Sequence, residues 1–163
     1  MKNKLIILSG CPGSGKTTYA KQHLKDIDYI SRDEIRFKIV KEDEPYFSKE
    51  VEVFNTFVDE INKRLRAGVD VIADATHLNP KSRLKLLSCL ELNKNKTQVE
   101  IYFMDTPLDV CLARNEQRIG TRSYVPRGQL RRMFFSIVKP NFEECCGLID
   151  VIHTIKMKGS VEE

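Results

Sequence analysis

An eight-residue motif near the start of the chain constrains the fold more than any other feature. Residues 10–17 read Gly-Cys-Pro-Gly-Ser-Gly-Lys-Thr and fit the pattern G-x-x-x-x-G-K-[ST]. The short apolar run Leu5–Leu8 precedes the motif, and we expect a helix over residues 16–25. Glycines let the backbone turn tightly around a phosphate, whose oxygens then bind successive N–H groups. Strand, loop and helix together predict a P-loop that binds a nucleoside triphosphate.

The P-loop pattern also assigns a task to each of its residues. Lys16 is expected to reach the β- and γ-phosphates, and the hydroxyl of Thr17 is expected to bind Mg²⁺. The positive end of the following helix adds to the attraction for phosphate. The predicted ATP-binding residues of this segment are Gly13, Ser14, Gly15, Lys16, Thr17 and Thr18.

The remaining sequence alternates short apolar strands with longer amphipathic helices. Ser31 and Asn79 are predicted helix N-caps, with Glu34 completing an S-x-x-E capping box after Ser31. Such alternation implies a parallel sheet with helices on both faces, hence an α/β P-loop kinase fold formed by a single domain over residues 1–163. The predicted strands are 5–8, 29–30, 69–73, 99–104 and 151–155, and helices are expected over 16–25, 49–66 and 126–138 and after Ser31, Asn79 and Pro107.

A second cluster follows the predicted strand that ends at Ile30, where ligands bind in open parallel sheets. Asp33 could accept the proton of an attacking hydroxyl, and Arg36, on the same helix face, could hold an acceptor phosphate. Alternatively, Asp33 only complements the helix dipole and Arg36 is solvated. The nearby P-loop favours the catalytic interpretation.

A third cluster follows the predicted strand 69–73. Asp74 is placed to order Mg²⁺-bound water, so Thr17 and Asp74 are the predicted metal-binding pair. Thr76 and His77 follow in the loop and are candidate contacts to the acceptor. The competing interpretation of His77 is an exposed loop histidine.

The arginine-rich last third of the chain predicts a lid over about residues 107–126. Arg114 and Arg118 are four residues apart, so we expect both on one helix face. Two guanidinium groups directed at a triphosphate would neutralise charge on the transferred group. The alternative is a solvated basic helix.

Charge is distributed unevenly along the chain. The formal net charge is +4, yet residues 114–139 alone contain seven basic residues and one acid. This basic segment could follow a phosphate backbone, with Arg122 and the basic residues after it available to an anionic acceptor. Residues 41–60 contain seven acids and two bases without a chemical motif, and we interpret them as a solvated helix face.

Apolar runs and cysteines indicate the compartment. No uncharged apolar run approaches the roughly 18 residues of a membrane span, and Leu5–Leu8 is too short for a secretory signal, so we expect a cytoplasmic protein without a membrane partner. The five cysteines include no C-x-x-C pair, so no metal beyond Mg²⁺ is expected. Buried, reduced thiols are predicted for Cys89, Cys111, Cys145 and Cys146.

These clusters resemble the kinase domain of phage-type polynucleotide 5′-kinases, within the wider P-loop kinase family. The resemblance spans most of the chain, except the acidic segment and the residues after about Met133. It rests on residues 10–18, 32–36, 76–80, Arg114-Asn115, Arg118, Gly120-Thr121 and Val125-Pro126.

The resemblance implies a mechanism and marks two departures. Lys16 and Arg118 would stabilise the γ-phosphoryl transition state, Asp33 would be the general base on a 5′-hydroxyl, and Arg36 would anchor the neighbouring phosphate. The family usually has Asn where His77 stands. The phage enzyme also carries a phosphatase domain, for which a chain of 163 residues is too short, so removal of a 3′-phosphate is not expected.

Three functions are compatible with the sequence. The first is an ATP-dependent kinase acting on the 5′-hydroxyl end of a polynucleotide, DNA or RNA. The second is a P-loop kinase for a small metabolite, nucleoside, nucleotide or antibiotic. The third is a nucleotide-binding regulatory module without phosphotransfer, which the candidate base Asp33 disfavours.

Overall fold

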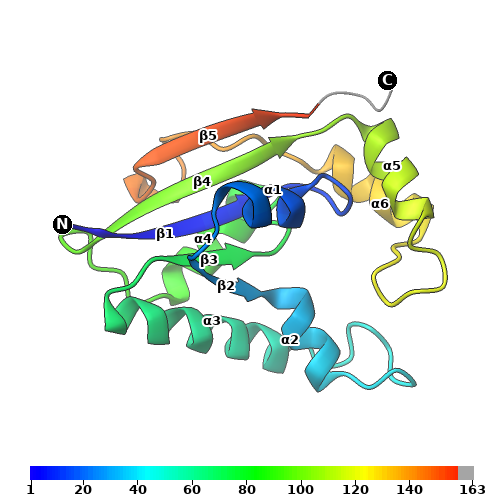
Figure 1. Cartoon of the computed structure of the whole chain (residues 1–163), viewed down its shortest axis with the longest axis horizontal. Coiled ribbons are helices and arrows are strands. Elements are labelled where there is room, and N and C mark those ends of the chain that lie inside the picture. Colours follow the sequence, from blue (N-terminus) through cyan, green and yellow to red (C-terminus); the bar gives the residue numbers. More distant parts are fainter. Residues whose placement is uncertain (158–163) are drawn as a thin grey trace.

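The computed structural model describes residues 1–157 and contains one five-stranded sheet (Figure 1). The strand order is β2-β3-β1-β4-β5, and all neighbouring strands are parallel, which confirms the predicted α/β fold. Residues 158–163 of the predicted single domain lie outside the described residues. The elements are β1 (Asn3–Ser9), α1 (Lys16–His23), β2 (Asp28–Ser31), α2 (Arg32–Ile39), α3 (Glu50–Ala67), β3 (Val71–Asp74), α4 (Pro80–Cys89), β4 (Thr97–Asp105), α5 (Leu108–Glu116), α6 (Arg127–Phe135), the 3₁₀ helix η1 (Cys145–Gly147) and β5 (Val151–Lys156).

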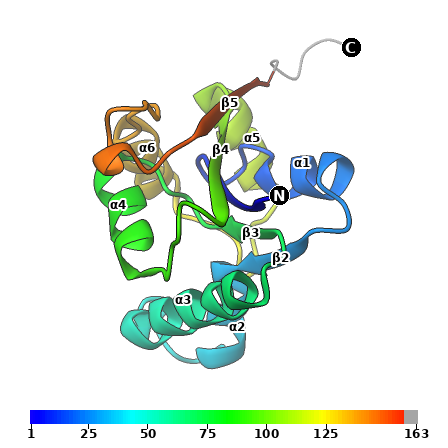
Figure 2. The same cartoon turned by 90° about the vertical axis from the view of Figure 1, so that its left-hand side faces the viewer.

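Helices cover both faces of the sheet, as Figure 2 shows for α1 and α4 on opposite sides. Leu5 and Ile7 of the central strand pack into the larger core, formed with α3 and α4. Ile6 and Leu8 point the other way and pack with Ala20 of α1. Because successive strand side chains face opposite sides, a strand covered on both faces becomes a continuous apolar run.

The register of the sheet brings three loops to one edge. Leu8 of β1 lies opposite Asp74 of β3, and Asp74 in turn lies opposite Ser31 of β2. The carboxyl ends of these three parallel strands are therefore level. The P-loop, the loop after Asp74 and the start of α2 all begin at this edge, where ligands bind in open parallel sheets.

Local signals place most helix ends correctly. The hydroxyl of Ser31 accepts the Glu34 N–H (3.2 Å), and Asn79 caps α4 in a reciprocal arrangement with Ser82. Gly68 ends α3 with a left-handed φ of 71°. The predicted helix over 126–138 instead ends at Phe135, because the chain turns so that the Val138 N–H donates to the Leu78 carbonyl (2.9 Å).

Two further predictions need correction. The strand predicted at 69–73 is 71–74, because the Val69 N–H bonds back to the Arg64 carbonyl at the end of α3. Burial of Cys111 and Cys145 is confirmed, but Cys89 and Cys146 are exposed, at the end of α4 and in η1. Within residues 1–157, no helix combines the length and apolarity needed to cross a bilayer.

Candidate active site

The P-loop connects β1 to α1 and depends on two glycines in left-handed conformations. Gly13 has a φ of +83° and Gly15 a φ of +99°. A Cβ atom on Gly13 would lie 2.7 Å from the Cys111 carbonyl oxygen, and one on Gly15 would lie 3.2 Å from the Arg114 guanidinium. The loop therefore packs against α5 at a distance that only glycine permits.

Polar groups of the P-loop are arranged to receive an anion. Lys16 Nζ donates to the carbonyls of Gly10 (2.8 Å) and Cys11 (3.2 Å), so its ammonium group lies over the loop. Ser14 Oγ is buried and has no hydrogen-bond partner within residues 1–157. Burial raises the pKa of the Cys11 thiol to about 12, which keeps that side chain neutral. The cradle, the ammonium group and the unpartnered hydroxyl fit a phosphate group.

Thr17 and Asp74, the predicted metal-binding pair, lie next to each other. Thr17 Oγ1 is 3.3 Å from Asp74 Oδ2, and Tyr29 of β2 donates its hydroxyl to the same carboxylate oxygen. Burial raises the pKa of Asp74. The hydroxyl and the carboxylate are oxygen donors of the kind Mg²⁺ prefers, and such sites are completed by water and substrate phosphates. Sequence reasoning missed Tyr29.

Asp33 and Arg36, one turn apart on α2, form an ion pair. Tyr46 donates its hydroxyl to Asp33 Oδ1 (2.7 Å) and accepts from Arg36 Nη1 (2.8 Å). Glu50, at the start of α3, accepts from Arg36 Nε (2.8 Å) and Nη2 (3.0 Å), a bidentate pair. The contacts of Asp33 with Arg36 and Tyr46 both use Oδ1, and the Asp33 side chain remains 58% exposed.

This arrangement corrects two interpretations of the sequence. Arg36 is 5% exposed, so the solvated alternative for it is wrong. The segment 41–60 is a solvated acidic face only in part, because Glu50 also binds Arg32 (3.0 Å). Although burial opposes ionisation, the hydrogen bond and charge of Arg36 lower the pKa of Glu50. A carboxylate and an arginine are therefore held rigidly at the sheet edge.

The loop after β3 lies against the P-loop. The Thr76 carbonyl accepts the Gly10 N–H (2.9 Å), and the buried Arg83 donates to the His77 carbonyl (2.8 Å). His77 is 5% exposed, and its Nδ1 donates to the Leu8 carbonyl (2.8 Å). The exposed-loop alternative for His77 is therefore wrong. Its φ of +44° lies in the left-handed region, in which Asn, Asp and His occur more often than most other residues.

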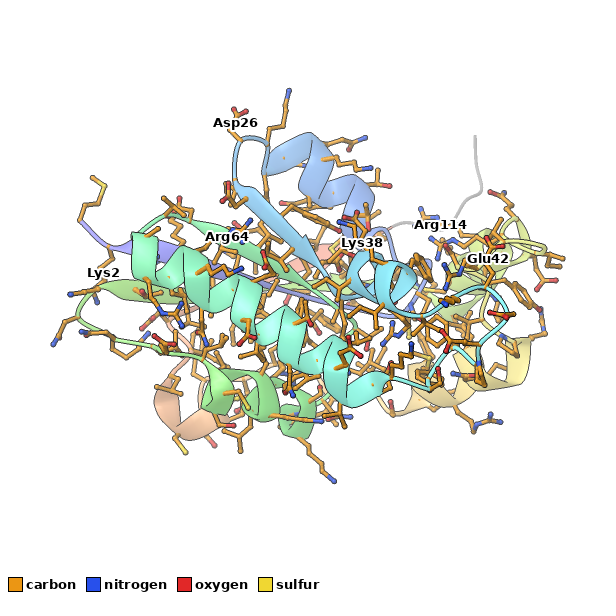
Figure 3. The ribbon with its side chains drawn as sticks, turned by 90° about the horizontal axis from the view of Figure 1, so that it is seen from below. Lys2, Asp26, Lys38, Glu42, Arg64 and Arg114 are labelled. Atoms are coloured by element: carbon orange, nitrogen blue, oxygen red, sulfur yellow. The ribbon has the colours of Figure 1, made fainter. Side chains whose placement is uncertain are left out.

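The first predicted lid arginine lies at the P-loop. Arg114 of α5 donates to the Gly13 carbonyl (3.0 Å). Figure 3 shows Arg114 toward the same end of the molecule as Glu42, in the loop after α2. Arg118 lies beyond α5, which ends at Glu116, so the two arginines do not share one α-helical face as predicted. Arg118 instead occupies a turn, in which its N–H bonds to the Asn115 carbonyl.

Loop 117–126 is fastened at two points. The buried Asn115 exchanges hydrogen bonds with both backbone groups of Val125 (2.6 and 3.0 Å), which closes the loop on itself. Arg122 donates to the carbonyls of Phe37 (3.1 Å) and Val40 (2.6 Å) at the end of α2. Its guanidinium also lies over the Phe37 ring. Arg122 therefore joins loop and α2 and is not the available cation that the sequence suggested.

The residues that sequence reasoning missed are the partners of the predicted ones. Tyr29, Tyr46 and Glu50 each contact a predicted site residue from a different element. Tyr46 and Glu50 lie in the acidic segment, where only the aromatic pair Tyr46-Phe47 just before a helix stands out from the surrounding charges. No spacing rule connects that pair to Asp33.

Comparison with known proteins places the chain in a family. A family model described as AAA domain matches residues 5–140. A protein of Autographa californica nuclear polyhedrosis virus, named as a bifunctional polynucleotide kinase/RNA ligase, is 26% identical over 133 residues, which cover 71% of this chain and 18% of that protein. The chain thus spans about a fifth of that relative.

Two solved structures share the fold at low sequence identity. One is the Pnkp1/Rnl/Hen1 RNA repair complex, with a TM-score of 0.68, 22% identity, and coverage of 83% of this chain and 44% of the other. The other is a sugar kinase from Janibacter sp. HTCC2649, with a TM-score of 0.63, 17% identity, and coverage of 96% and 86%. The match over residues 5–140 and the shared fold establish that the chain belongs to the AAA domain family and has the fold of the P-loop kinases.

Proposed function

We propose that this protein transfers the γ-phosphate of ATP to the 5′-hydroxyl end of a polynucleotide. The observation that carries the proposal is the pair Asp33–Arg36, held by Tyr46 and Glu50 at the sheet edge that also bears the P-loop. The viral relative and the RNA repair complex support a polynucleotide acceptor. The sugar kinase neighbour keeps a small-metabolite acceptor as the alternative to be tested.

On the donor side, we assign Gly13, Ser14, Gly15 and Thr18 to the ATP phosphates. Lys16 and Arg118 are assigned to the γ-phosphoryl group, where charge is spread over the transferred oxygens, and Arg114 to the phosphates beside Gly13. Thr17 and Asp74 would hold Mg²⁺, which neutralises phosphate charge when bound. Loop 117–126, together with α5, is the proposed lid.

On the acceptor side, the exposed carboxylate of Asp33 accepts the proton of the 5′-hydroxyl. The hydroxyl oxygen forms a bond to the γ-phosphorus, the bond from that phosphorus to the bridging oxygen breaks, and ADP leaves with the electron pair. Arg36 is assigned to the neighbouring acceptor phosphate, and Glu50 fixes the plane of its guanidinium group. Because this guanidinium is buried and already bound by Asp33 and Tyr46, the phosphate would take the place of one of those two partners. Thr76 lies at the same edge as a further contact, whereas the buried His77 shapes the loop from behind.

The test compares acceptors under one set of conditions. The protein is incubated with γ-labelled ATP and 5′-hydroxyl RNA or DNA 12-mers, and in parallel with sugars, nucleosides and aminoglycosides. We expect label on the oligonucleotide 5′ end. Label on a small molecule alone would favour the metabolite kinase, and absence of label on every oligonucleotide would overturn the proposal.

Asp33→Asn tests the general base. We expect at least a hundredfold loss of transfer, within the range of general-base contributions, while ATP affinity is unchanged. Asp59→Asn, an exposed carboxylate on α3, is the matched control and should retain full activity. Retained turnover in Asp33→Asn would remove Asp33 from this role.

A further inference from the structure

Helix α6 is fixed in place by its apolar face. Leu130 is fully buried in a cluster that includes Cys11 of the P-loop, Leu78 of the loop after β3, and Cys111 of α5. Met133 and Phe134 pack against the same cluster. The outer face of α6 therefore has a defined position relative to the nucleotide site.

That outer face carries arginines and an exposed ring. Arg127, Arg131 and Phe135 follow one another at intervals of four residues, so they lie along one side of the helix. Arg132 lies beside them, and we call these four residues the α6 stripe. Phe135 is 69% exposed, with the Arg131 guanidinium 5.8 Å from its ring centroid. A shallow hollow of about 500 Å³ is lined by Gly128, Arg131, Arg132, Phe135 and Ser136.

The charges of the α6 stripe are not neutralised by the protein. Residues 117–142 contain no Asp or Glu, and within residues 1–157 none of the three stripe arginines forms an ion pair. The arginines before residue 84 behave differently, and Arg114 and Arg122 donate to backbone carbonyls. Each of Arg32, Arg36, Arg64, Arg66 and Arg83 pairs with a carboxylate.

The position of α6 relates the stripe to the candidate active site. Figure 1 shows α6 and α5 beyond the carboxyl ends of the strands, at the end of the molecule where the loop after α2 also lies. A strand whose 5′ end is at Asp33 continues past the site with one phosphate for every nucleotide. A nucleoside or a sugar is too small to extend beyond the site, so it would not contact a second surface.

We propose that the α6 stripe binds the acceptor strand downstream of its 5′ end, with arginines on phosphates and a base stacked on Phe135. Cationic side chains interleaved with an exposed ring are the combination that proteins use for single-stranded nucleic acid. A protein partner with an acidic surface could bind to the arginines alone, and its binding would not require the exposed ring. This inference rests on the proposed function, since it takes the acceptor to be a polynucleotide.

The test separates strand binding from phosphotransfer. Binding of a 3′-fluorescein single-stranded RNA 20-mer is followed by anisotropy over a KCl series, with no ATP present. We expect R127A/R131A/R132A to weaken binding at least tenfold and to reduce the slope of log K against log salt by about 2. Phe135→Leu should weaken binding about fivefold with the slope unchanged. The control K2A/K21A/K25A removes the same charge from exposed lysines elsewhere and should change neither quantity by much.

Kinetics supply the second readout. In R127A/R131A/R132A the KM for the 20-mer should rise at least tenfold, while the KM values for a nucleoside 3′-monophosphate and for ATP stay unchanged. The inference is overturned if wild-type protein does not bind the 20-mer, or if the triple variant keeps its affinity and slope. Either result would favour a protein partner for the stripe. If the stripe binds RNA but no oligonucleotide is phosphorylated, the proposed function fails. The assignment of the bound strand as the acceptor then fails with it, and only RNA binding by the stripe stands.

Discussion

The donor and acceptor sides of the candidate site are built in different ways. The donor side is a run of consecutive residues, 10–17, in which left-handed glycines shape the candidate phosphate cradle. The acceptor side is a set of side chains from three elements, in which Asp33 and Arg36 of α2 meet Tyr46 of the following loop and Glu50 of α3. Backbone geometry defines the first side and side-chain contacts define the second.

This difference predicts how each side responds to mutation. A cradle made of backbone tolerates no Cβ at its glycines, so a single methyl group can destroy it. A network of side-chain hydrogen bonds loses its members one at a time, and each neutral hydrogen bond contributes about 1 kcal/mol. We therefore expect large effects on the donor side and, apart from the proposed base Asp33, graded effects on the acceptor side.

The largest effect is expected for Gly13→Ala. The added Cβ would lie 2.7 Å from the Cys111 carbonyl, at a φ of +83°, so the loop must move. ATP affinity, measured by calorimetry, should fall at least a hundredfold, because the backbone N–H groups proposed to bind phosphate lose their alignment. Gly68→Ala, at the end of α3, is the control, since its φ is +71° but no atom lies within 4 Å of the new Cβ. Equal losses in both variants would show that φ alone matters.

The second prediction concerns His77, whose loop lies between the two sides. Burial lowers the pKa of His77 to about 4, from an ordinary value of 6.5. The unfolded chain therefore binds a proton more readily, and the stability that the neutral ring provides is complete above pH 6.5 and lost as the pH falls toward 4. The positive charges of Arg32, Lys16 and Arg83 act in the same direction.

His77→Asn should remove this part of the pH dependence. Between pH 7 and pH 4.5, urea denaturation should show wild-type protein losing about 2 kcal/mol more than the variant. His23→Asn, at an exposed position on α1, is the control. Identical pH profiles for wild type and His77→Asn would contradict the buried neutral ring.

Glu50→Gln is expected to have an intermediate effect, confined to the acceptor side. The variant keeps the shape of the side chain but loses the charge that binds Arg32 and Arg36. We expect the KM for a 5′-hydroxyl oligonucleotide to rise about tenfold, with the KM for ATP unchanged. Glu52→Gln, exposed on the same turn of α3, should have no effect. A rise in both KM values would mean that the two sides are coupled through α2.

The smallest effect is expected for Tyr46→Phe. This change removes one hydrogen bond to Asp33 and one from Arg36 but keeps the ring beside the Arg36 guanidinium. We expect kcat to fall about threefold, as for the loss of a solvent-accessible hydrogen bond. Tyr124→Phe, in loop 117–126, is the control. A hundredfold fall in kcat would mean that the Tyr46 hydroxyl does more than position Asp33.

Sequence patterns were sufficient to predict the structure of a segment wherever its conformation depends on residues nearby in the chain. The motif at residues 10–17, the N-caps Ser31 and Asn79 and the apolar strand 5–8 all act through neighbours within a few residues, and the structure confirms them. The patterns failed where a distant partner decides the outcome. The sequence allowed His77 to be an exposed loop residue, but in the structure the Leu8 carbonyl and the Phe57 ring lie against it.

Arg122 illustrates the same limit. In the sequence it is one more cation in a basic segment, and only the folded chain brings it to the carbonyls at the end of α2. Arg127, Arg131 and Arg132 have the same charge in the same segment, yet they remain exposed and unpaired within residues 1–157. A count of charges cannot distinguish these cases, because the partners of an arginine depend on which segments the fold brings next to it.

The sequence by itself determined the strand–loop–helix unit that holds phosphate and the parallel α/β sheet, because both depend on local conformation and on the period of apolar residues. The tertiary structure alone decided which side chains hold Asp33 and Arg36, since Tyr46 reaches Asp33 and Glu50 reaches Arg36 only when α2 packs against α3. A nucleotide cradle is a property of the backbone over eight residues. An acceptor site made of side-chain contacts exists only after the chain has folded.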